Sequence, residues 1–492
     1  MILYVKGKIT VRTYQTRIDS SDQGYALLSE YACLYGKIER TLFAETIAQD
    51  IKPETVKNTY LRSFSITARQ FNAVCRNLKG KAASIKERRN GLIIESAQRI
   101  NKAEKVISVL EKKLKSFPNS VDSAKLKLAL HQKKRRLHIL QIKRSTMVQD
   151  KKDNTIRMCF GSKKLFHTQY HLEKNGYANH SEWKKDWKQS RNNQFYFLGS
   201  KDETAGCQGC VATKTENSFL LRLRLPEGIN STRKYLKLPI SLAYGDDVLE
   251  GALTGKQAVS YRFLKDDKGW RVFISTKAIS VEKQTSQELG AIGVDINVDH
   301  LAVNEIDRSG NPVTAKKINL CTYGKSSHQA SAIIGDAVKE LMSFSQSKGK
   351  PIVVEDLDFK KKKSELERSD KKMARMLSSF SYEKILSCIK ARSEDSGIEF
   401  IEINPAFTSV IGKFKFAKRY GISTHQAAAC AIARRGLKLS ERPNRRDYVA
   451  SFLPVRNRNK HVWSYWGKVS RNKAVHVALS SLASSQSRPP LY

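Results

Sequence analysis

The spacing of apolar and polar positions divides the chain into segments with different periods. Residues 1–17 alternate one by one, as a β-strand does. From 18 to about 155, leucines and isoleucines recur every three or four residues, which predicts helices. Pro118 and Asn119 separate two of these stretches, 107–117 and 124–140, so we expect a helical hairpin there.

Short alternating stretches fill the next part of the chain, residues 156–288. They have the sequences QFYFLGS, SFLLRLRLP, KYLKLPISL, AVSYRFLKD and WRVFISTKA, and turn-forming glycine, proline and aspartate residues separate them. The spacing predicts a small antiparallel barrel or sheet. In the stretch 221–225, LRLRL, we expect Arg222 and Arg224 on the face opposite the leucines.

Strands and a helix alternate in residues 289–450. The strand patterns GVDINV, HLAVNEID and VTAKKINL follow one another, with a turn at 309–311. A helix is expected from His328 to Ser345, and then a fourth strand, IVVEDLDF. This order predicts an RNase H-like core, and the whole chain is expected to be a multidomain α+β protein.

Two of these strands end in carboxylates. Asp295 lies between apolar residues of the first strand, and Glu355 ends the run PIVVE. In an RNase H-like core the first strand and a later strand each supply a metal ligand, and two-metal phosphodiester cleavage needs ions about 4 Å apart. A third ligand is expected on a later helix, where the alanine-rich segment 425–435 begins with His425.

Three further aspartates, Asp299, Asp356 and Asp358, flank the proposed ligands and are interpreted as supporting or solvent-facing groups. Cys207 and Cys210 form the one cysteine pair at metal-ligand spacing, and two thiolates leave a zinc site half empty. We therefore expect a loop without metal there. The other cysteines are isolated, which favours a reducing cytoplasm.

Composition adds a partner class. The 492 residues carry a formal net charge of +42, with 40% hydrophobic and 28% charged residues, which is typical of a folded protein that binds a polyanion. No apolar run approaches the length of a membrane span, so no membrane partner is expected. Charge alone predicts nucleic-acid binding and does not predict nuclease activity, because ribosomal proteins share this composition.

Basic residues concentrate between 79 and 144, where there are 19 Lys and Arg but only 5 Asp and Glu. Contact with a nucleic-acid backbone is the favoured interpretation, and a solvated face is the alternative. The tail after 450 has Trp463, Tyr465 and Trp466, which either stack on unpaired bases or anchor the tail to the core. The residues expected to bind nucleic acid are Lys133, Lys134, Arg135, Arg136, Arg222, Arg224, Lys413, Lys415, Arg434, Arg435, Arg445 and Arg446.

These motifs resemble TnpB, the family of transposon-encoded RNA-guided nucleases related to type V CRISPR effectors. GVDINVDHLAV, with Asp295, resembles the first RuvC motif, and VVEDLDF, with Glu355, resembles the second. IEINPAFTS, at 401–409, is similar to the strand and P-x-x-T-S element of the family. HQAAACAIARR takes the place of the third motif, which is usually D-x-N-A-A-x-N-I.

The resemblance implies a domain order for nearly the whole chain, with specific motifs in the last 200 or so residues. It gives an opening strand of a wedge-like barrel at 1–17, a helical recognition lobe at 18–155, the wedge-like β-barrel at 156–288, a RuvC nuclease domain at 289–450 with a reduced target-strand insert near 404–422, and a basic aromatic tail at 451–492.

The chain departs from the family in two places. It has no cysteine between Cys388 and Cys430, so the usual zinc ribbon has no ligands and zinc is not expected. His425 stands where aspartate is usual, and an imidazole adds no negative charge, so magnesium is held less strongly and manganese can substitute. Asp447 could complete the site instead, or cleavage has been lost.

The resemblance implies an RNA-guided DNA endonuclease with Asp295, Glu355 and His425 as catalytic metal ligands. Its expected cofactors are magnesium and a guide RNA, and its partners are that RNA, double-stranded target DNA and the displaced strand. A bacterial cytoplasmic, nucleoid-associated location is expected. One alternative is an RNA-guided DNA-binding protein without nuclease activity that blocks transcription; the other is a guide-independent resolvase.

Overall fold

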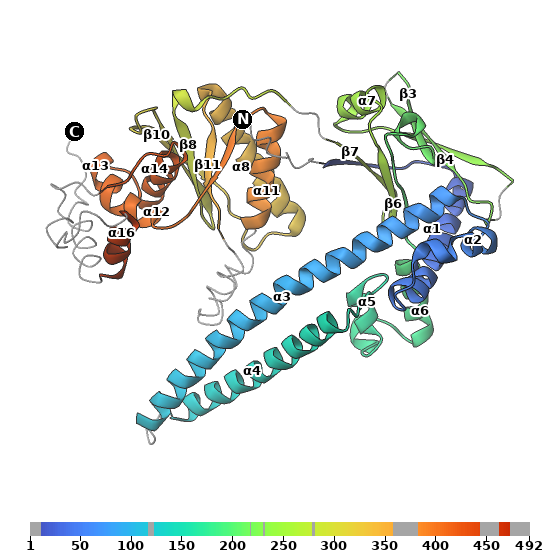
Figure 1. Cartoon of the computed structure of the whole chain (residues 1–492), viewed down its shortest axis with the longest axis horizontal. Helices are drawn as coiled ribbons and strands as arrows, with labels where there is room; N and C mark the ends of the chain where they lie inside the picture. The colour runs from blue at the N-terminus through green and yellow to red at the C-terminus, as the bar shows by residue number, and fades with distance from the viewer. Residues whose placement is uncertain are drawn as a thin grey trace. The chain divides into compact units, whose positions relative to one another are not determined.

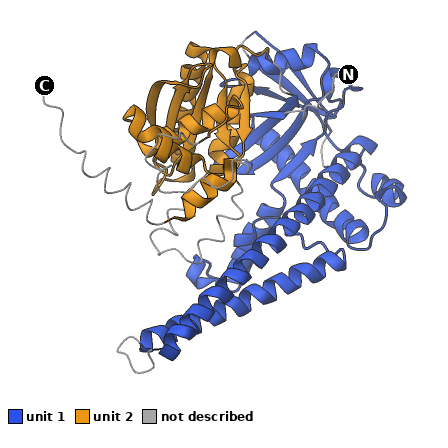
Figure 2. Ribbon diagram, turned by 60° about the vertical axis from the view of Figure 1, so that its left-hand side comes forward, with its two compact units in different colours: residues 1–279 blue, residues 280–492 orange. Residues whose placement is uncertain are grey.

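The chain forms two compact units in the computed structural model, residues 1–279 and 280–492 (Figure 2). The structure describes residues 11–116, 123–216, 218–229, 232–277, 281–357, 382–442 and 462–472.

Helices make up most of the first part of unit 1. In chain order they are α1 (Asp22–Leu42), the π-helix η1 (Phe43–Ile47), α2 (Pro53–Ser63), α3 (Ala68–Ser116), α4 (Ser123–Lys152), α5 (Lys163–Thr168), η2 (Glu173–Asn175) and α6 (His180–Arg191). No helix within the described ranges is both long enough and apolar enough to span a membrane.

The predicted helical hairpin is confirmed, with α3 and α4 packed side by side (Figure 1). The 49 residues of α3 extend about 70 Å. In α4 only Leu140 is buried, and Leu128 is 60% exposed. The expected apolar face of α4 is therefore only partly covered, because α3 is the one long helix that packs against it.

Seven strands of unit 1 form two sheets. They are β1 (Val11–Arg17), β2 (Gln194–Phe197), β3 (Cys210–Lys214), β4 (Phe219–Arg224), β5 (Tyr235–Ile240), β6 (Ser260–Asp266) and β7 (Gly269–Lys277). Two short helices, η3 (Thr204–Gly206) and α7 (Asp246–Thr254), lie between them. The sheet orders are β1-β7-β6-β2 and β3-β4-β5, all antiparallel. Among the described strands no barrel closes.

The N-terminal strand pairs with the last strand of unit 1, Val11 opposite Lys277 and Arg17 opposite Arg271. The predicted alternation in β4 is confirmed: Leu221 and Leu223 are fully buried, whereas Arg222 is exposed and Arg224 half-buried.

Unit 2 is built on one five-stranded sheet with the order β10-β9-β8-β11-β12. The strands are β8 (Ala291–Ile296), β9 (His300–Ile306), β10 (Pro312–Asn319), β11 (Ile352–Glu355) and β12 (Phe400–Ile403). The first three are antiparallel neighbours, and β11 runs parallel to both β8 and β12. This is the predicted RNase H-like order.

Helices pack on both faces of this sheet (Figure 1). In chain order they are η4 (Gln287–Leu289), α8 (Ser327–Lys348), α11 (Tyr382–Asp395), α12 (Thr408–Ile411), the π-helix η5 (Gly412–Ala417), α13 (Lys418–Tyr420), α14 (Thr424–Gly436) and α16 (Val462–Arg471). One core contains Ile292, Val294 and Val354 together with residues of α8 and α11. The other contains Val353 and Ile403 with residues of α14 and α16.

The alanine-rich helix α14 lies very close to the sheet, as its composition predicts. Seven consecutive residues, 427–433, are buried. A Cβ added to Gly293 of β8 would collide with the carbonyl oxygen of Ala429, so only glycine permits this approach. The middle of α14 is therefore held against the strand that carries Asp295.

Candidate active site

Asp295 and Glu355 occupy matching positions on neighbouring parallel strands. Val294 of β8 pairs with Val354 of β11, and the next residue along each strand is the carboxylate. Both strands end there or one residue later, so the two acids lie at the carboxyl edge of the sheet. Active sites of α/β sheets gather at this edge.

Both carboxylates also point to the same face of the sheet. Side chains alternate along a strand, and Ile292, Val294 and Val354 pack in the core with α8 and α11. The intervening residues Gly293 and Val353 pack against α14. Asp295 and Glu355 therefore face the side that α14 covers.

His425 meets Asp295 directly. Its Nδ1 atom lies 3.0 Å from Oδ2 of Asp295. Ser423 and Gln426 form a capping box that begins α14, and this box places His425 in the first turn. The imidazole is 51% exposed, whereas the Asp295 side chain is 15% exposed. The pair is thus accessible from solvent on the imidazole side.

Two more side chains surround this pair. Asn297 donates from Nδ2 to Oδ2 of Asp295 over 3.0 Å. The rings of His300 and His425 lie edge to face, with their centroids 5.3 Å apart. His300 in turn hydrogen-bonds Asp299 over 2.7 Å, and this contact holds the pKa of the Asp299 carboxyl below its usual range. Asp299 therefore orients His300, whose ring packs against that of His425.

Glu355 is positioned by residues from later elements. The hydroxyl of Thr408, at the start of α12, donates to its Oε1 atom. The preceding Phe407 adopts a φ of 65°, a strained conformation for a bulky residue that turns the chain into α12. Tyr382 donates its hydroxyl to the Glu355 carbonyl oxygen over 2.7 Å.

Charge links these groups. Burial raises the pKa of Tyr382, and the nearby carboxylates of Glu355 and Asp356 raise it further, so the phenol stays protonated. Burial lowers the pKa of the Arg435 guanidinium, and the negative charge of Glu355 opposes this effect. Arg435 therefore lies within electrostatic range of Glu355.

The structure thus brings Asp295 and His425 into contact and places Glu355 on the neighbouring strand. Among the residues described, no three His, Cys, Asp or Glu side chains gather closely enough to form a metal cluster. Asp356 is exposed beyond the end of β11. Asp358 and Asp447 lie outside the described residues.

Two of the residues predicted to contact nucleic acid form ion pairs with an internal acid. Lys415 Nζ lies 2.5 Å from Oε2 of the buried Glu441, and Arg434 binds the other oxygen of that carboxylate. Both cations are 15% exposed. Both side chains bind this one internal carboxylate, and their contact with nucleic acid stays a prediction.

The other predicted contacts are more open. Lys134 and Arg135 are exposed on α4, with Lys133 and Arg136 half-buried beside them. Lys134 forms an ion pair of 2.8 Å with Glu111. Lys413 is half-buried in η5. Arg445 and Arg446 lie outside the described residues.

The sequence left two roles open for the aromatic residues of the tail, stacking on bases or anchoring the tail to the core, and the structure distinguishes them in part. Trp466 is 2% exposed and donates from Nε1 to the carbonyl oxygen of Glu441 over 2.8 Å, so it anchors α16 to the core. Trp463 is 37% exposed, with the Arg435 guanidinium 5.7 Å from its ring centre. Of the three aromatic residues, Trp463 keeps a surface on which a base could stack.

Sequence reasoning missed several residues that position the site. Asn297 follows Asp295 by two residues, and Thr408 lies in the P-x-x-T-S element, so each was visible in a motif without a role attached. Tyr382 and Glu441 have no such pattern. Their contacts join segments far apart in the chain.

No model of a known protein family matches the chain, and neither does any curated protein. Among solved structures, the chain is similar to T. thermophilus RuvC in complex with a Holliday junction substrate, at 14% identity and a TM-score of 0.22, over 30% of this chain and 90% of that one. It is also similar to a CRISPR-Cas12f ternary complex, at 11% identity and a TM-score of 0.21, over 86% of this chain and 98% of that one.

A third similar structure is the Cas12f1-sgRNA-target DNA complex, at 12% identity and a TM-score of 0.22, over 86% of this chain and 99% of that one. None of these TM-scores exceeds 0.22. These similarities therefore carry no argument about the function of this chain.

Proposed function

We propose that the chain is an RNA-guided DNA endonuclease that hydrolyses phosphodiester bonds at Asp295 and Glu355. The observation that carries the proposal is the matched position of these two carboxylates at the carboxyl edge of an RNase H-like sheet, on the face covered by α14. Net charge of +42 gives the protein a strong attraction for nucleic acid despite this acidic centre.

The donor atoms of Asp295, Glu355 and His425 suit a divalent cation in chemical type, although the three described side chains are not gathered into a ligand cluster. Neighbouring carboxylates repel each other, and a cation between them relieves the repulsion. Their oxygens are the ligands that Mg²⁺ prefers, and the imidazole of His425 suits Mn²⁺ as well. Asp295, Glu355 and His425 would hold the ion, which when bound would activate water and stabilise the leaving oxygen.

The chain's own residues prepare this site. Asn297 and Thr408 each donate a hydrogen bond to a carboxylate and fix its orientation. Arg435 supplies positive charge near Glu355. The exposed side of His425 leaves a path for a strand to reach the carboxylates.

RNA guidance is the finer part of the proposal, and it rests on the resemblance to TnpB. The basic hairpin α3–α4 would contact the backbone of a guide RNA or its heteroduplex, while base pairing supplies most of the sequence specificity. A short flanking motif would be read by the protein.

The test is a cleavage assay with the RNA that co-purifies with the protein. That RNA is sequenced, and a plasmid with a complementary target is incubated with wild-type protein, Asp295→Asn or Glu355→Gln. Each substitution should lower the cleavage rate at least about a hundredfold and leave target binding unchanged. Undiminished cutting by either variant would contradict the site assignment.

Glu402→Gln is the matched control. Glu402 lies on β12, beside β11, but it pairs with Val354 and its side chain reaches Lys390 of α11, on the opposite face of the sheet. Cleavage by this variant should equal that of the wild type. A loss of cleavage by Glu402→Gln would show that activity depends on the total negative charge near the sheet, and not on the carboxylates of the face that α14 covers.

One observation favours a second candidate, an RNA-guided DNA-binding protein without nuclease activity. His425 occupies the position of the third acidic ligand and contacts Asp295 at 3.0 Å. In that case the wild type would bind its target tightly without cleavage in magnesium or manganese, and His425→Asp would restore cutting.

A further inference from the structure

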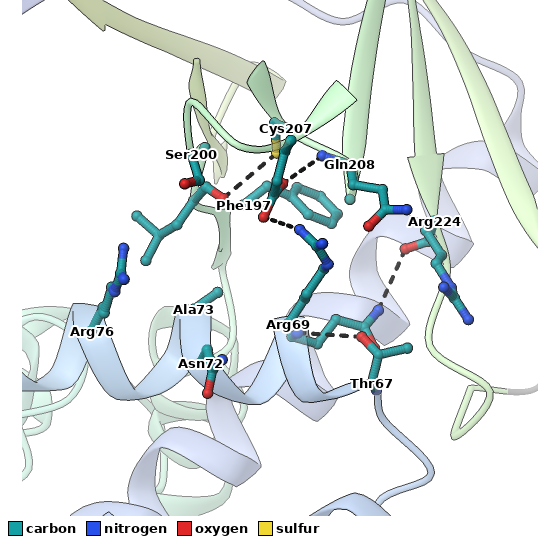
Figure 3. Close-up of a pocket in the computed structure, with 15 residues that line it drawn as sticks. Thr67, Arg69, Asn72, Ala73, Arg76, Phe197, Ser200, Cys207, Gln208 and Arg224 are labelled. Atoms are coloured by element: carbon teal, nitrogen blue, oxygen red, sulfur yellow. Dashed lines mark hydrogen bonds and ion pairs between the residues drawn. The ribbon is translucent and has the colours of Figure 1, made fainter. Parts of the chain in front are cut away.

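A cavity of 180 Å³ opens between the start of α3 and the loop that joins β2 to β3 (Figure 3). All its lining residues belong to unit 1, so it is separate from the carboxylate site of unit 2. Its inner lining includes the buried side chains of Ala73, Phe197 and Cys207. Exposed polar residues, among them Asn72 and Gln208, lie at its edge.

The loop over the cavity has a fixed and strained backbone. Ala205 adopts a φ of 51°, which is uncommon for a residue with a Cβ, and Gly206 follows with 69°. The Glu203 carboxylate accepts a hydrogen bond of 2.6 Å from the backbone of Gln208 and forms an ion pair with Arg69. Such strain often marks a ligand-binding segment, because the surrounding structure must hold it in place.

Three arginines and one carboxylate face this space. Arg69 is neutralised by Glu203. Within the described part of the chain, the guanidinium groups of Arg76 and Arg224 have neither a hydrogen-bond partner nor a charged partner. Figure 3 shows these two groups on opposite sides of Arg69. The cavity therefore carries net positive charge at two separate points, and it suits a ligand with an anionic group at each end.

The polar groups of the lining include the hydroxyls of Thr67 and Ser200 and three side-chain amides. Gln70 is already engaged, because its Nε2 atom donates to Tyr31 over 3.2 Å. The amides of Asn72 and Gln208 have no partner among the residues described. A side-chain amide offers both a donor and an acceptor, which is the combination that pairs with the edge of a nucleobase.

We propose that this cavity binds one unpaired nucleotide of a nucleic-acid strand. Its base enters between α3 and the loop, and phosphates of the strand on the 5′ and the 3′ side of this nucleotide meet Arg76 and Arg224. The two separate guanidinium groups favour a nucleotide within a strand over a free nucleotide, whose phosphates lie on one side. The proposal rests on the proposed function in taking nucleic acid as the ligand, but it requires neither cleavage nor a guide.

The test uses the full chain and fluorescein-labelled single-stranded pentanucleotides of RNA and of DNA, with binding measured by fluorescence anisotropy. Arg76→Ala and Arg224→Ala should each weaken binding about five- to tenfold through loss of a phosphate contact. Asn72→Trp should weaken it similarly without a change of charge, because the indole fills the cavity entrance. Asn72 is exposed, so this variant is expected to fold, and its thermal unfolding is compared with that of the wild type.

Arg62→Ala is the matched control. Arg62 is an exposed arginine of α2 that does not line the cavity, so its removal should change affinity less than twofold. A fully paired duplex should be insensitive to Asn72→Trp, since its bases cannot enter. Comparison of the RNA and DNA probes shows which kind of strand binds the cavity. AMP is added as a competitor to test whether a free nucleotide binds there instead.

Four results would overturn the proposal. Equal affinity of wild type and Asn72→Trp would show general electrostatic attraction and no cavity. Displacement of the pentanucleotide by AMP at equal concentration would assign the cavity to a free nucleotide. No binding of either pentanucleotide would reject it outright, and if longer strands also fail to bind, the proposed function fails with it. If the variants bind the pentanucleotides as the wild type does and still cleave the plasmid, the cavity proposal fails and the proposed function stands.

Discussion

Nδ1 of His425 and Oδ2 of Asp295 are 3.0 Å apart. Asp295 is therefore hydrogen-bonded to an imidazole and not paired with a further carboxylate. The helix start, capped by Ser423, fixes this imidazole beside β8. The site therefore has one negative charge fewer than a site with three carboxylates. This difference bears first on cation binding.

His425→Asp should lower the magnesium concentration needed for half-maximal cleavage, by about tenfold. The added carboxylate supplies another oxygen ligand and another negative charge, both of which hard cations prefer. Magnesium binding measured by calorimetry on the uncut complex gives a readout independent of turnover. An unchanged magnesium requirement would place His425 outside the metal site, and His425→Gln serves as the neutral control.

Thr408→Val should reduce cleavage about ten- to a hundredfold, because Glu355 loses the hydroxyl that orients it. Valine keeps the shape of the buried threonine, so packing is largely retained. Thr408→Ser restores the hydroxyl and should recover most of the rate. Failure of the serine variant to recover would mean that Thr408 acts through packing alone.

Gly293→Ala should destabilise unit 2 by about 1–3 kcal/mol, since the added Cβ meets the carbonyl oxygen of Ala429 and forces α14 away from β8. Urea denaturation measures this change. Gly335→Ala is the control: this helical glycine of α8 has no atom within 4 Å of an added Cβ, so its substitution should stabilise by about 0.5–1 kcal/mol. A neutral result at Gly293 would show that α14 can shift freely.

Glu441→Gln should cost about 3–5 kcal/mol of folding free energy. The buried carboxylate forms ion pairs with both Lys415 and Arg434, and its loss leaves these two cations without their shared counter-charge inside the unit. Glu402→Gln breaks the more exposed pair with Lys390 and should change stability by less than about 1 kcal/mol. Equal effects in the two variants would contradict a structural role for Glu441.

The sequence predicted the elements that carry the candidate site because their local patterns are strong. Apolar runs that end in a carboxylate identified β8 and β11, and the alanine run identified α14 with His425 at its start. Strand order then placed Asp295 and Glu355 on one sheet. Their matched register follows from the pairing of Val294 with Val354, which only the structure gives.

Other features depend on contacts that no local pattern reveals. Glu441 reaches Lys415 across 26 residues, and Thr408 reaches Glu355 across 53. The predicted barrel illustrates the same limit, since alternation identifies strands but closure depends on their stagger and tilt. Strand β3 was missed because its three apolar residues, 210–212, are consecutive and do not alternate with polar ones.

The buried cysteines should resist alkylation in the folded protein. Burial raises the pKa of Cys207 to about 11 and that of Cys430 to about 12, so at pH 8 only about one thiol in a thousand or fewer is ionised. Cys33 and Cys321 are exposed and should react with iodoacetamide first, as mass spectrometry of the labelled peptides would show. Labelling of Cys207 should rise about tenfold for each pH unit, because a raised pKa leaves the thiolate fraction proportional to hydroxide. Chelation with EDTA should not alter this rate, whereas a bound zinc ion at Cys207 and Cys210 would make labelling faster after chelation.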